Sequence, residues 1–576
     1  MLRITNKHTL LSCITSIILS SPLSSRAQDA AFSLKATQLP PKYETRAVWI
    51  TTLNGMDWPH VKANSPEGIN RQKEELCHQL DELKKANINT ILLQTRLRNE
   101  VIYPSSIEIF TEVLTGSLGK DPGYDPLAFA INECHKRGME CHAWVVAIPL
   151  GSDRQVRLMG SRSLVKKRSD LCIHHNNHWY LDPGNPETKT YISSIVKEIV
   201  TRYDVDGISL DYIRYNDRPQ IFPDRKSYRK YGNGKSLNQW RRDNITAIVR
   251  SVYETVKAIK PWVKVGSSPI GKYGDLQRFS SRGWNAHSGV MQDAQLWMRE
   301  GIQDLLLPMS YFRENNFYPF VLDWQENCNG RTVAPGLGIY FLDPSEGNWT
   351  LRDAMQQIYF TRCARIPGQA YFRAHFLLNN TQGLLDTIKK EVYVYPALTP
   401  PMTWQDSIPP LSPADVTIMN EGDSTVITWK APAIQKANPL YGGLRYNVYA
   451  GRSKQVDTDD PRCLKAVYLQ GTRYALPTDR SKDLHFKVTA VDRYGNESKQ
   501  ALSPSPHTSV VPSHQLIDLP SYPTATRIVI TDLYGRTVQQ LPYNRKVLIQ
   551  NLEKGVYYLT VQDNKQNLLL RQQIIR

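Results

Sequence analysis

Between Glu44 and Pro400 the chain alternates short β-rich runs with amphipathic helical runs, and this alternation constrains the fold more than any other feature. Helical patterns include Glu187 to Tyr203 and Leu237 to Lys260, the second ended by Pro261. Repeated βα units build parallel sheets, so residues 43–400 are predicted to form an α/β fold, a (β/α)8 TIM barrel with enlarged loops. A doubly wound open sheet is the alternative. The expected strands are Thr45 to Leu53, Ile88 to Leu97, Glu140 to Ile148, Val205 to Ile213, Val263 to Ile270, Asp304 to Phe312, Thr332 to Phe341 and Gln369 to Leu377.

The pattern changes after two proline pairs, Pro400-Pro401 and Pro409-Pro410, which predict a linker. Period-two alternation then replaces the helical pattern. The sequence therefore predicts two small all-β sandwich domains after the barrel, at residues 411–505 and 520–576.

The first 27 residues have the form of a signal peptide. Arg3 and Lys7 precede an apolar run from Leu10 to Leu19, and Ser25-Arg26-Ala27 matches a signal-peptidase site. The run is too short to span a membrane, and no later stretch of about 18 apolar residues follows. We therefore expect an exported protein without a transmembrane segment, in the periplasm, on the outer-membrane surface or outside the cell.

The composition of the chain limits the ligands and macromolecules that it is expected to bind. Seven cysteines remain after export without a Cys-x-x-Cys pair, which predicts mostly buried thiols and neither a disulfide framework nor a zinc knuckle. The formal charge of +17 is spread along the chain and favours anionic polymers such as cell-wall glycans, while no nucleic-acid module is recognisable. The polar cluster His174 to His178 lacks an acidic ligand in register, so no metal or cofactor is expected.

The segment Tyr203 to Tyr215 carries the strongest chemical signal. Its apolar residues alternate with Gly207 and Ser209, which keep one face of the strand small, and Asp211 follows on that face. A carboxylate at the end of a buried barrel strand suits a catalytic acid or nucleophile. Asp206 lies roughly 16 Å away at the other end of the strand and is expected to be structural. In the alternative interpretation, both aspartates only cap the strand.

Glycoside hydrolysis usually requires two carboxyl groups. For the second we consider Glu314, just after an expected strand, and Asp182, which precedes Pro183 and a helix. Solvent exposure and helix capping are their respective ordinary roles. A 2-acetamido sugar that supplies its own nucleophile would relax this requirement.

Several aromatic and basic residues fall at or just after expected strand ends, where they could bind hydroxyl or carboxylate groups or stack on sugar rings. Core packing or a salt bridge is the alternative for each. These candidates are Arg96, His142, Trp144, Tyr212, Arg214 and Tyr311.

Taken in order, the barrel motifs resemble the glycosyl-hydrolase-like family 10. The resemblance implies a (β/α)8 glycosidase, in a family that includes an enzyme cleaving peptidoglycan glycan strands stripped of their peptides, and it adds Trp58 to the substrate-binding candidates. The chain departs from the family at Pro308-Met-Ser-Tyr311 and at Phe312, so the subsite there is expected to differ. The motifs are Glu44-Thr-Arg-Ala-Val-Trp49, Met56-Asp-Trp-Pro59, Gln94-Thr-Arg96, Tyr103-Pro-Ser105, Asp121-Pro-Gly-Tyr-Asp-Pro126, His142-Ala-Trp144, Leu181-Asp-Pro183, Asp206-Gly207, Asp211-Tyr-Ile-Arg-Tyr215, Ser268-Pro-Ile-Gly271, Gln292-Asp293 and Pro308 to Tyr311.

The two β regions carry their own resemblances. Thr425 to Trp429, Tyr446 to Tyr449 and Phe486 to Ser498 resemble strands of a fibronectin type III domain, which implies a spacer or docking module. Arg527 to Arg536 and Asn551 to Thr560 resemble the C-terminal sorting domain of the type IX secretion system, which implies that machinery as a partner. The usual Tyr-Pro-Asn-Pro lead-in is replaced by Ser521-Tyr-Pro-Thr524, and a β-sandwich without a sorting role is the alternative.

Together these features predict an exported glycosidase that cleaves an amino-sugar polysaccharide, with peptidoglycan glycan strands as the specific candidate. The competing hypothesis is a surface protein that binds glycans through an inactive barrel.

Overall fold

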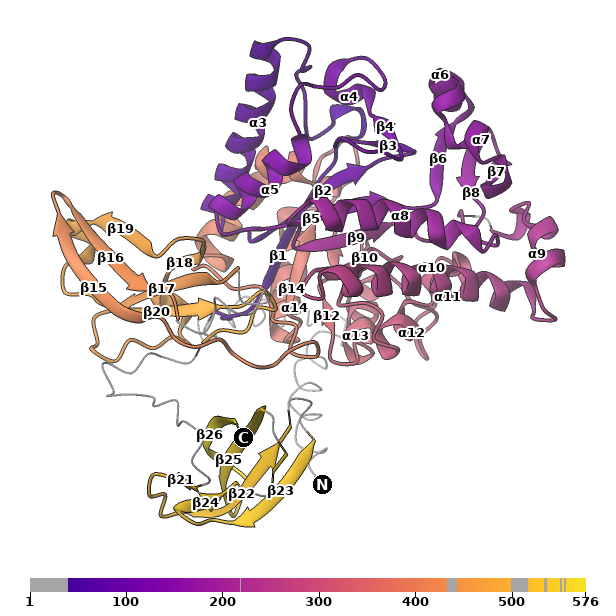
Figure 1. Ribbon diagram of the computed structural model, residues 1–576. Helices are drawn as coiled ribbons and strands as arrows, with labels where there is room; N and C mark the ends of the chain where they lie inside the picture. Colours follow the sequence, from indigo (N-terminus) through magenta and orange to yellow (C-terminus); the bar gives the residue numbers. More distant parts are fainter. Residues whose placement is uncertain are drawn as a thin grey trace, which may run out of the picture. The chain divides into compact units, whose positions relative to one another are not determined.

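The computed structural model describes residues 40–217, 219–432, 443–498, 516–532, 536–549, 552–553 and 556–575 (Figure 1). The predicted signal peptide, residues 1–27, lies outside the described residues. The chain divides into two compact units, residues 1–501 and 502–576. Each unit is considered by itself below.

In the described part of the first unit, eight parallel strands close into a barrel. The segment 332–337 completes the ring, because β12 pairs with β11 and β13 pairs with β14. This closure confirms the predicted (β/α)8 barrel and excludes the open-sheet alternative. All eight expected segments contain a strand, although the strands are shorter than expected. They are β1 (Thr45–Ile50), β2 (Thr90–Arg96), β5 (Glu140–Val146), β9 (Gly207–Asp211), β10 (Lys264–Ser267), β11 (Leu305–Leu306), β12 with β13 (Thr332–Val333, Gly336–Leu337) and β14 (Gly368–Tyr371).

Helices follow the strands around the outside of the barrel (Figure 1). The two helices whose limits the sequence predicts begin at the expected residues, Glu187 and Leu237, and each ends one residue before its expected limit. Side chains before several helices accept bonds from first-turn amides, as Ser65 does from Gly68. The main helices are α3 (Pro66–Lys85), α5 (Pro126–Lys136), α8 (Glu187–Arg202), α10 (Leu237–Ile259), α12 (Ala294–Arg299), α13 (Tyr318–Glu326), α14 (Leu351–Cys363), α15 (Ala374–Leu378) and α16 (Leu384–Thr387).

Long loops at the C-terminal ends of the strands carry further elements. The loop after β5 holds a three-stranded antiparallel sheet in the order β6-β8-β7. The loop elements are β3 (Glu100–Val101), β4 (Ile109–Phe110), α4 (Glu112–Thr115), β6 (Pro149–Ser152), α6 (Asp153–Met159), α7 (Leu164–Lys167), β7 (Cys172–His175), β8 (His178–Leu181), α9 (Arg225–Tyr231) and α11 (Ala286–Gly289). These excursions surround the end of the barrel where (β/α)8 enzymes hold their active sites.

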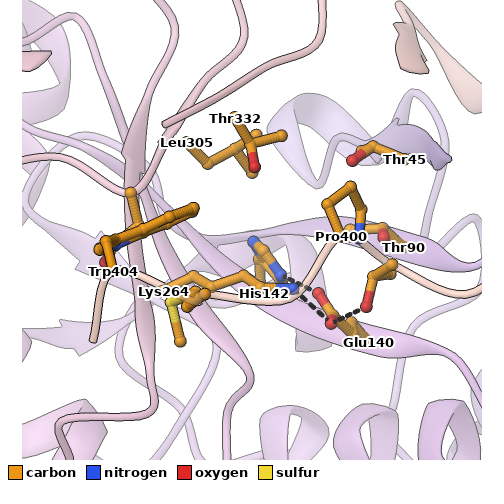
Figure 2. Close-up of a pocket in the computed structure, with 12 residues that line it drawn as sticks. Thr45, Thr90, Glu140, His142, Lys264, Leu305, Thr332, Pro400 and Trp404 are labelled. Atoms are coloured by element: carbon orange, nitrogen blue, oxygen red, sulfur yellow. Dashed lines mark hydrogen bonds and ion pairs between the residues drawn. The ribbon is translucent and has the colours of Figure 1, made fainter. Parts of the chain in front are cut away.

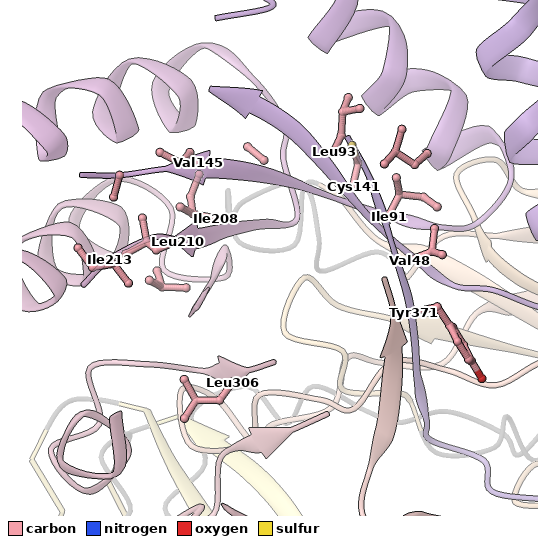
Figure 3. Close-up of a cluster of buried hydrophobic side chains, with 14 of the residues drawn as sticks. Val48, Ile91, Leu93, Cys141, Val145, Ile208, Leu210, Ile213, Leu306 and Tyr371 are labelled. Carbon is pink, nitrogen blue, oxygen red and sulfur yellow. The ribbon is translucent and has the colours of Figure 1, made fainter. Parts of the chain in front are cut away.

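The main hydrophobic core lies between the strands and the helices. Alternate strand residues such as Val48, Ile91, Val145 and Ile208 point into this layer and are buried (Figure 3). Each such side chain contributes about 1.5–3 kcal/mol through burial. The residues between them face the barrel axis.

The barrel interior explains the small residues of β9. In the register of β5 and β9, His142 lies opposite Gly207 and Trp144 lies opposite Ser209. A Cβ atom on Gly207 would come within 2.5 Å of the His142 ring. The large side chains of β5 therefore require small neighbours on the inner face of β9, which leaves Asp211 at its open end.

The proline-rich segment after the barrel, which the sequence predicts to be a linker, is packed against the barrel's N-terminal end. Thr399 Oγ1 donates to Glu140 Oε1 at 2.6 Å, and Trp404 Nε1 donates to Asp304 Oδ1 at 2.9 Å. Figure 2 shows Pro400 and Trp404 around the small polar cavity at this end. The cavity measures about 10 Å³, too little for more than one water molecule.

The described residues that follow form two three-stranded antiparallel sheets with a shared core around Trp429 and Val448. Arg445 from this part bonds Asp206 of the barrel at 2.7 Å. The fibronectin type III resemblance stays a prediction. The strands are β15 (Ala414–Glu421), β16 (Ser424–Lys430), β19 (Arg473–Pro477), β18 (Leu464–Leu469), β17 (Arg445–Gly451) and β20 (His485–Val491).

The second unit is all-β in its described residues. A four-stranded and a two-stranded antiparallel sheet enclose a core that includes Ile528, Ile530 and Leu559. Its strands are β21 (Leu516–Asp518), β22 (Ala525–Thr531), β23 (Thr537–Pro542), β24 (Lys546–Leu548), β25 (Val556–Asp563) and β26 (Leu568–Ile575).

The cysteines in the described ranges are free thiols. Cys134 and Cys141 are buried, whereas five are partly exposed, so the expectation of mostly buried thiols is wrong. The five are Cys77, Cys172, Cys328, Cys363 and Cys463.

Candidate active site

Asp211 is the last residue of β9 and lies at the C-terminal end of the barrel. Its side chain is 6% exposed. The Tyr212 backbone N–H donates to Oδ1 at 2.7 Å, and Trp144 Nε1 donates to Oδ2 at 3.0 Å. Burial raises the pKa of Asp211, against the opposing effects of the Tyr212 amide, the Arg214 charge and the Trp144 bond. Because burial disfavours the charged form, this carboxyl group holds its proton more firmly than an exposed aspartate does.

Trp144 and Tyr311 reach the same end of the barrel from other strands. Trp144 lies on β5, two residues above His142 on the same inner face. Tyr311 follows β11, and burial together with the nearby Asp211 carboxylate raises its pKa well above the usual value. The fold thus gathers Asp211, Trp144 and Tyr311 from three strands.

Further aromatic residues, which the sequence analysis did not select, lie beside Tyr311. The Tyr311 ring lies 5.4 Å from Phe372 and 5.8 Å from Tyr340, measured between centroids. Tyr340 and Phe372 lie just past β13 and β14, inside two of the expected strand segments. The same rule that selected Tyr311, an aromatic residue at a strand end, would have found both.

Tyr212 and Arg214 flank Asp211 in sequence. Tyr212 has a left-handed backbone, φ 48°, and is 43% exposed. This conformation is unfavourable for a residue with a bulky side chain, and such strain is frequent at functional sites. The Arg214 guanidinium carbon lies 4.9 Å from the centre of the Tyr212 ring, and Nη1 contacts Asp217 Oδ1 at 2.6 Å. A ring and a cation thus stand immediately beside the Asp211 carboxyl group.

The two candidates for a second carboxyl group lie in different settings. Glu314 is exposed in the loop after β11. Asp182 is buried, with Oδ1 accepting from the Gly184 amide at 2.9 Å and Oδ2 accepting from Ser227 Oγ. Neither is among the groups that set the pKa of Asp211. The structure therefore does not bring either carboxylate against Asp211.

Trp58 and Arg96 are placed differently from the sequence-based expectation. Trp58 is fully buried beneath α3, and its Nε1 donates to the Gln72 carbonyl at 2.9 Å. Arg96 is 0% exposed and forms a two-pronged ion pair with Glu108, at 2.8 and 2.7 Å. Its remaining contacts are with the carbonyls of Val146 and Ala147. Both residues stabilise the barrel wall, because neither has a face open to a substrate.

His142 was expected at a strand end, and this placement is wrong. It is the third residue of β5, and Nε2 lies 2.9 Å from Glu140 Oε2 at the opposite end of the barrel (Figure 2). Burial opposes ionisation of Glu140, but Lys264 and His142 lower its pKa to about 2. His142 therefore belongs to a buried ionic network below the site.

Asp206 joins the same end of the barrel, as its position in the sequence predicts. Oδ2 lies 2.7 Å from His135 Nε2 and accepts from the Cys141 amide at 2.9 Å, and Oδ1 accepts from Arg445 at 2.7 Å. Burial would raise its pKa, but Arg445 and His135 hold it well below the usual value. Asp206 is therefore an ionised structural residue.

Within the described ranges, no cluster of three or more histidine, cysteine or acidic side chains could hold a metal ion. His174 lies against Asp153 at 2.9 Å, while His178 contacts the Asn176 carbonyl. No described helix has the length and apolar character needed to cross a membrane. The described side chains gathered around this end of the barrel include the buried Asp211 carboxyl group, aromatic rings and Arg214.

The chain is similar to several known proteins. The chain is 31% identical over 477 residues to Glycosyl hydrolase YngK of Bacillus subtilis, covering 79% of this chain and 92% of that protein. It is 33% identical over 286 residues to Glycosyl hydrolase DigH of Escherichia coli, covering 46% of this chain and 65% of that protein. Among solved structures, the PgaB (BpsB) glycoside hydrolase domain from Bordetella bronchiseptica matches with a TM-score of 0.40 and 14% identity, over 61% of this chain and 99% of that one.

Two families match separate parts of the chain. Residues 504–576 match the secretion system C-terminal sorting domain, which marks the protein for export to the cell surface or beyond. This match begins earlier than the region expected from the sequence. Residues 44–339 match Glycosyl hydrolase-like 10, a span of more than half of the 576 residues. The chain therefore belongs to the glycosyl hydrolase-like 10 family.

Proposed function

We propose that this protein is an exported glycoside hydrolase that cleaves an amino-sugar polysaccharide, specifically peptidoglycan glycan strands. The observation that carries the proposal is the buried Asp211 carboxyl group at the catalytic end of the barrel, with a raised pKa and aromatic neighbours. Family membership supports a glycosidase. The names of the relatives state hydrolysis of glycosides and do not state the substrate.

Asp211 would act as the general acid. A glycosidic oxygen leaves more readily when it is protonated as its bond to the sugar breaks, and a carboxyl group with a raised pKa holds the necessary proton at higher pH. Trp144 orients the carboxyl group by its bond to Oδ2. The rings of Tyr311, Tyr340 and Phe372 would pack against sugar faces.

Glu314 is our candidate for the second carboxyl group. It lies in a loop at the catalytic end and is solvent-exposed, so it is free to approach a bound glycan. Asp182 is the weaker candidate, because both of its oxygens are already engaged. If the acetamido group of the substrate supplies the nucleophile, Glu314→Gln will retain most activity, whereas a direct role predicts a loss of about 10²-fold or more.

The net charge and the predicted export of the protein are both consistent with this substrate. The formal charge of +17 attracts anionic glycans. We assign residues 1–27 to a signal peptide, 43–400 to the barrel, 411–505 to a fibronectin type III-like spacer and 520–576 to the sorting domain that secretion machinery would recognise. The protein would then act at the outer-membrane surface or outside the cell.

The test is incubation of the mature protein with intact peptidoglycan and with peptide-stripped glycan strands, followed by mass spectrometry of the soluble products. New reducing ends from the stripped strands are expected. Absence of products from both substrates would refute the hydrolase proposal.

A catalytically inactive glycan-binding protein is the second candidate function. It is favoured by one observation, that the hydrogen-bond partners of the Asp211 carboxyl group among the described residues are Trp144 and the Tyr212 amide, with no second carboxyl group. Such a protein would retain stripped strands in a pull-down experiment without shortening them.

A further inference from the structure

A second pocket lies close to Asp211, because the next residue, Tyr212, is part of its lining. It has a volume of about 190 Å³ and lies between the β6–β8 insertion and the segment that follows β9. Figure 1 shows this insertion projecting away from the barrel strands, above α8 in this view. Its lining includes Arg98, Trp179, Tyr180, Tyr212 and Arg214. Two arginines and several rings therefore share a hollow next to the proposed catalytic acid.

Arg214 is incompletely paired in this pocket. It is 8% exposed, and Nη1 donates to Asp217 at 2.6 Å and to the Tyr215 carbonyl at 3.1 Å. Its Nε is buried and has no hydrogen-bond partner among the described residues. An unpaired buried donor on a cation is costly, so a ligand acceptor at this position would be strongly bound.

Arg98 adds a second cation. It lies in the loop after β2, is only partly buried, and forms no ion pair within the described ranges. Asp217 is the acidic residue of the lining, and it is already paired with Arg214. The pocket consequently carries excess positive charge.

Exposed rings border the same cation. The Arg214 guanidinium carbon lies 4.9 Å from the Tyr212 ring centre and 6.0 Å from that of Trp284. Tyr212 is 43% exposed and Trp284 is 36% exposed. Solvent-facing aromatic rings beside a cation suit a sugar that bears a negative group, because the ring stacks while the charge is paired.

We propose that this pocket is a subsite for a carboxylate-bearing sugar, with Arg98 and Arg214 binding the carboxylate and Tyr212 stacking on the ring. The inference rests on the proposed function and makes it more specific, since a glycan strand freed of its peptides exposes a lactyl carboxylate on every second sugar. A peptide joined to that carboxyl group would remove the charge and add bulk at the pocket. The subsite therefore selects stripped strands.

The test measures binding to the full chain carrying Asp211→Asn, which removes turnover. Isothermal titration calorimetry compares soluble peptide-stripped glycan fragments with the same fragments after chemical reduction of their carboxylates to alcohols. We expect reduction to weaken binding about tenfold or more. Adding Arg98→Gln should abolish this difference, and adding Arg214→Gln should do the same.

Arg71→Gln is the matched control, because Arg71 is exposed on α3, away from the pocket lining. It should preserve the preference for the carboxylate form. If Arg214→Gln fails to fold, the Arg98→Gln variant alone tests the subsite, since Arg98 is partly exposed and forms no ion pair with a described residue.

The two proposals fail in different ways. Equal binding of the carboxylate and reduced fragments overturns the subsite, even if the wild type cleaves both. A retained preference in a wild type that releases no products supports the subsite and overturns the hydrolase.

Discussion

Two buried aspartates at opposite ends of β9 show how one residue type takes two roles. Asp206, directly before the strand, faces Arg445 and His135, and its pKa lies well below the usual value. Asp211, at the other end, accepts from two neutral hydrogen-bond donors and forms no ion pair with a described residue, and burial raises its pKa. Both are buried to a similar extent, so the difference comes from the charges around them.

Burial alone therefore does not identify a catalytic carboxyl group. A buried carboxylate that is ion-paired with cations is held ionised and contributes to stability, whereas burial without such an ion pair raises the pKa, which suits acid catalysis. In this protein the paired carboxylates Glu140 and Asp206 lie at the closed end of the barrel, and Asp211 lies at the end surrounded by long loops.

The largest change in stability is expected from a substitution of Asp206, the structural aspartate. Asp206→Asn leaves Arg445 without its partner and should lower the free energy of unfolding by roughly 3–5 kcal/mol. Urea denaturation measures this change. Asp204→Asn is the control, because the Asp204–Arg493 pair joins the same two parts near the surface and should cost about 1 kcal/mol or less. Equal losses would refute the distinction.

The effect of Asp206 should also depend on pH in a defined direction. Its folded-state pKa is lowered, so its contribution is present above the unfolded value near 3.8 and is lost as pH falls through the folded value. The difference between the wild type and Asp206→Asn should therefore shrink in acid. A difference that stays constant down to strong acid would contradict the pairing.

A smaller effect is expected from Trp144→Phe, which removes the bond to Asp211 Oδ2. We expect kcat to fall roughly tenfold. The bond lowers the pKa of Asp211, so its loss should raise that pKa and move the basic limb of the pH–rate profile to higher pH. An unmoved limb would mean that Asp211 is not the titrating acid.

The smallest effect concerns the stability of Asp211→Asn. Because the folded-state pKa of Asp211 is raised, wild-type stability relative to the variant should be greatest below the unfolded pKa and should decline as pH rises through the folded value. Thermal melts across this pH range measure the trend. The opposite slope would place Asp211 with Asp206 among the structural carboxylates.

Much of this fold follows from sequence patterns. Each expected β-rich run contains a barrel strand, and Gly207 and Ser209 are small because His142 and Trp144 lie opposite them. Position at a strand end also selected Asp211 and Tyr311, which the barrel brings together. The alternation of apolar and small residues and the order of the β-rich runs can be read directly from the sequence.

The candidates that the structure places away from Asp211 share a physical cause. His142 and Trp144 lie on the same inner face, yet two residues of strand separate them by roughly 6.6 Å, which places one in the closed end of the barrel and the other beside Asp211. Arg96 is the last residue of β2 and Trp58 lies in the loop after β1, but both side chains turn into the wall, where Glu108 and Gln72 bind them. Depth within a barrel and the direction of a loop depend on distant segments, so a local pattern does not reveal them.

The most direct test of the central claim is the turnover number of Asp211→Asn on peptide-stripped glycan strands, measured beside the wild type with folding verified by circular dichroism. We expect kcat to fall by about 10²–10⁴-fold while the fold is kept, because the variant lacks the general acid. Activity within a factor of two of the wild type would contradict it.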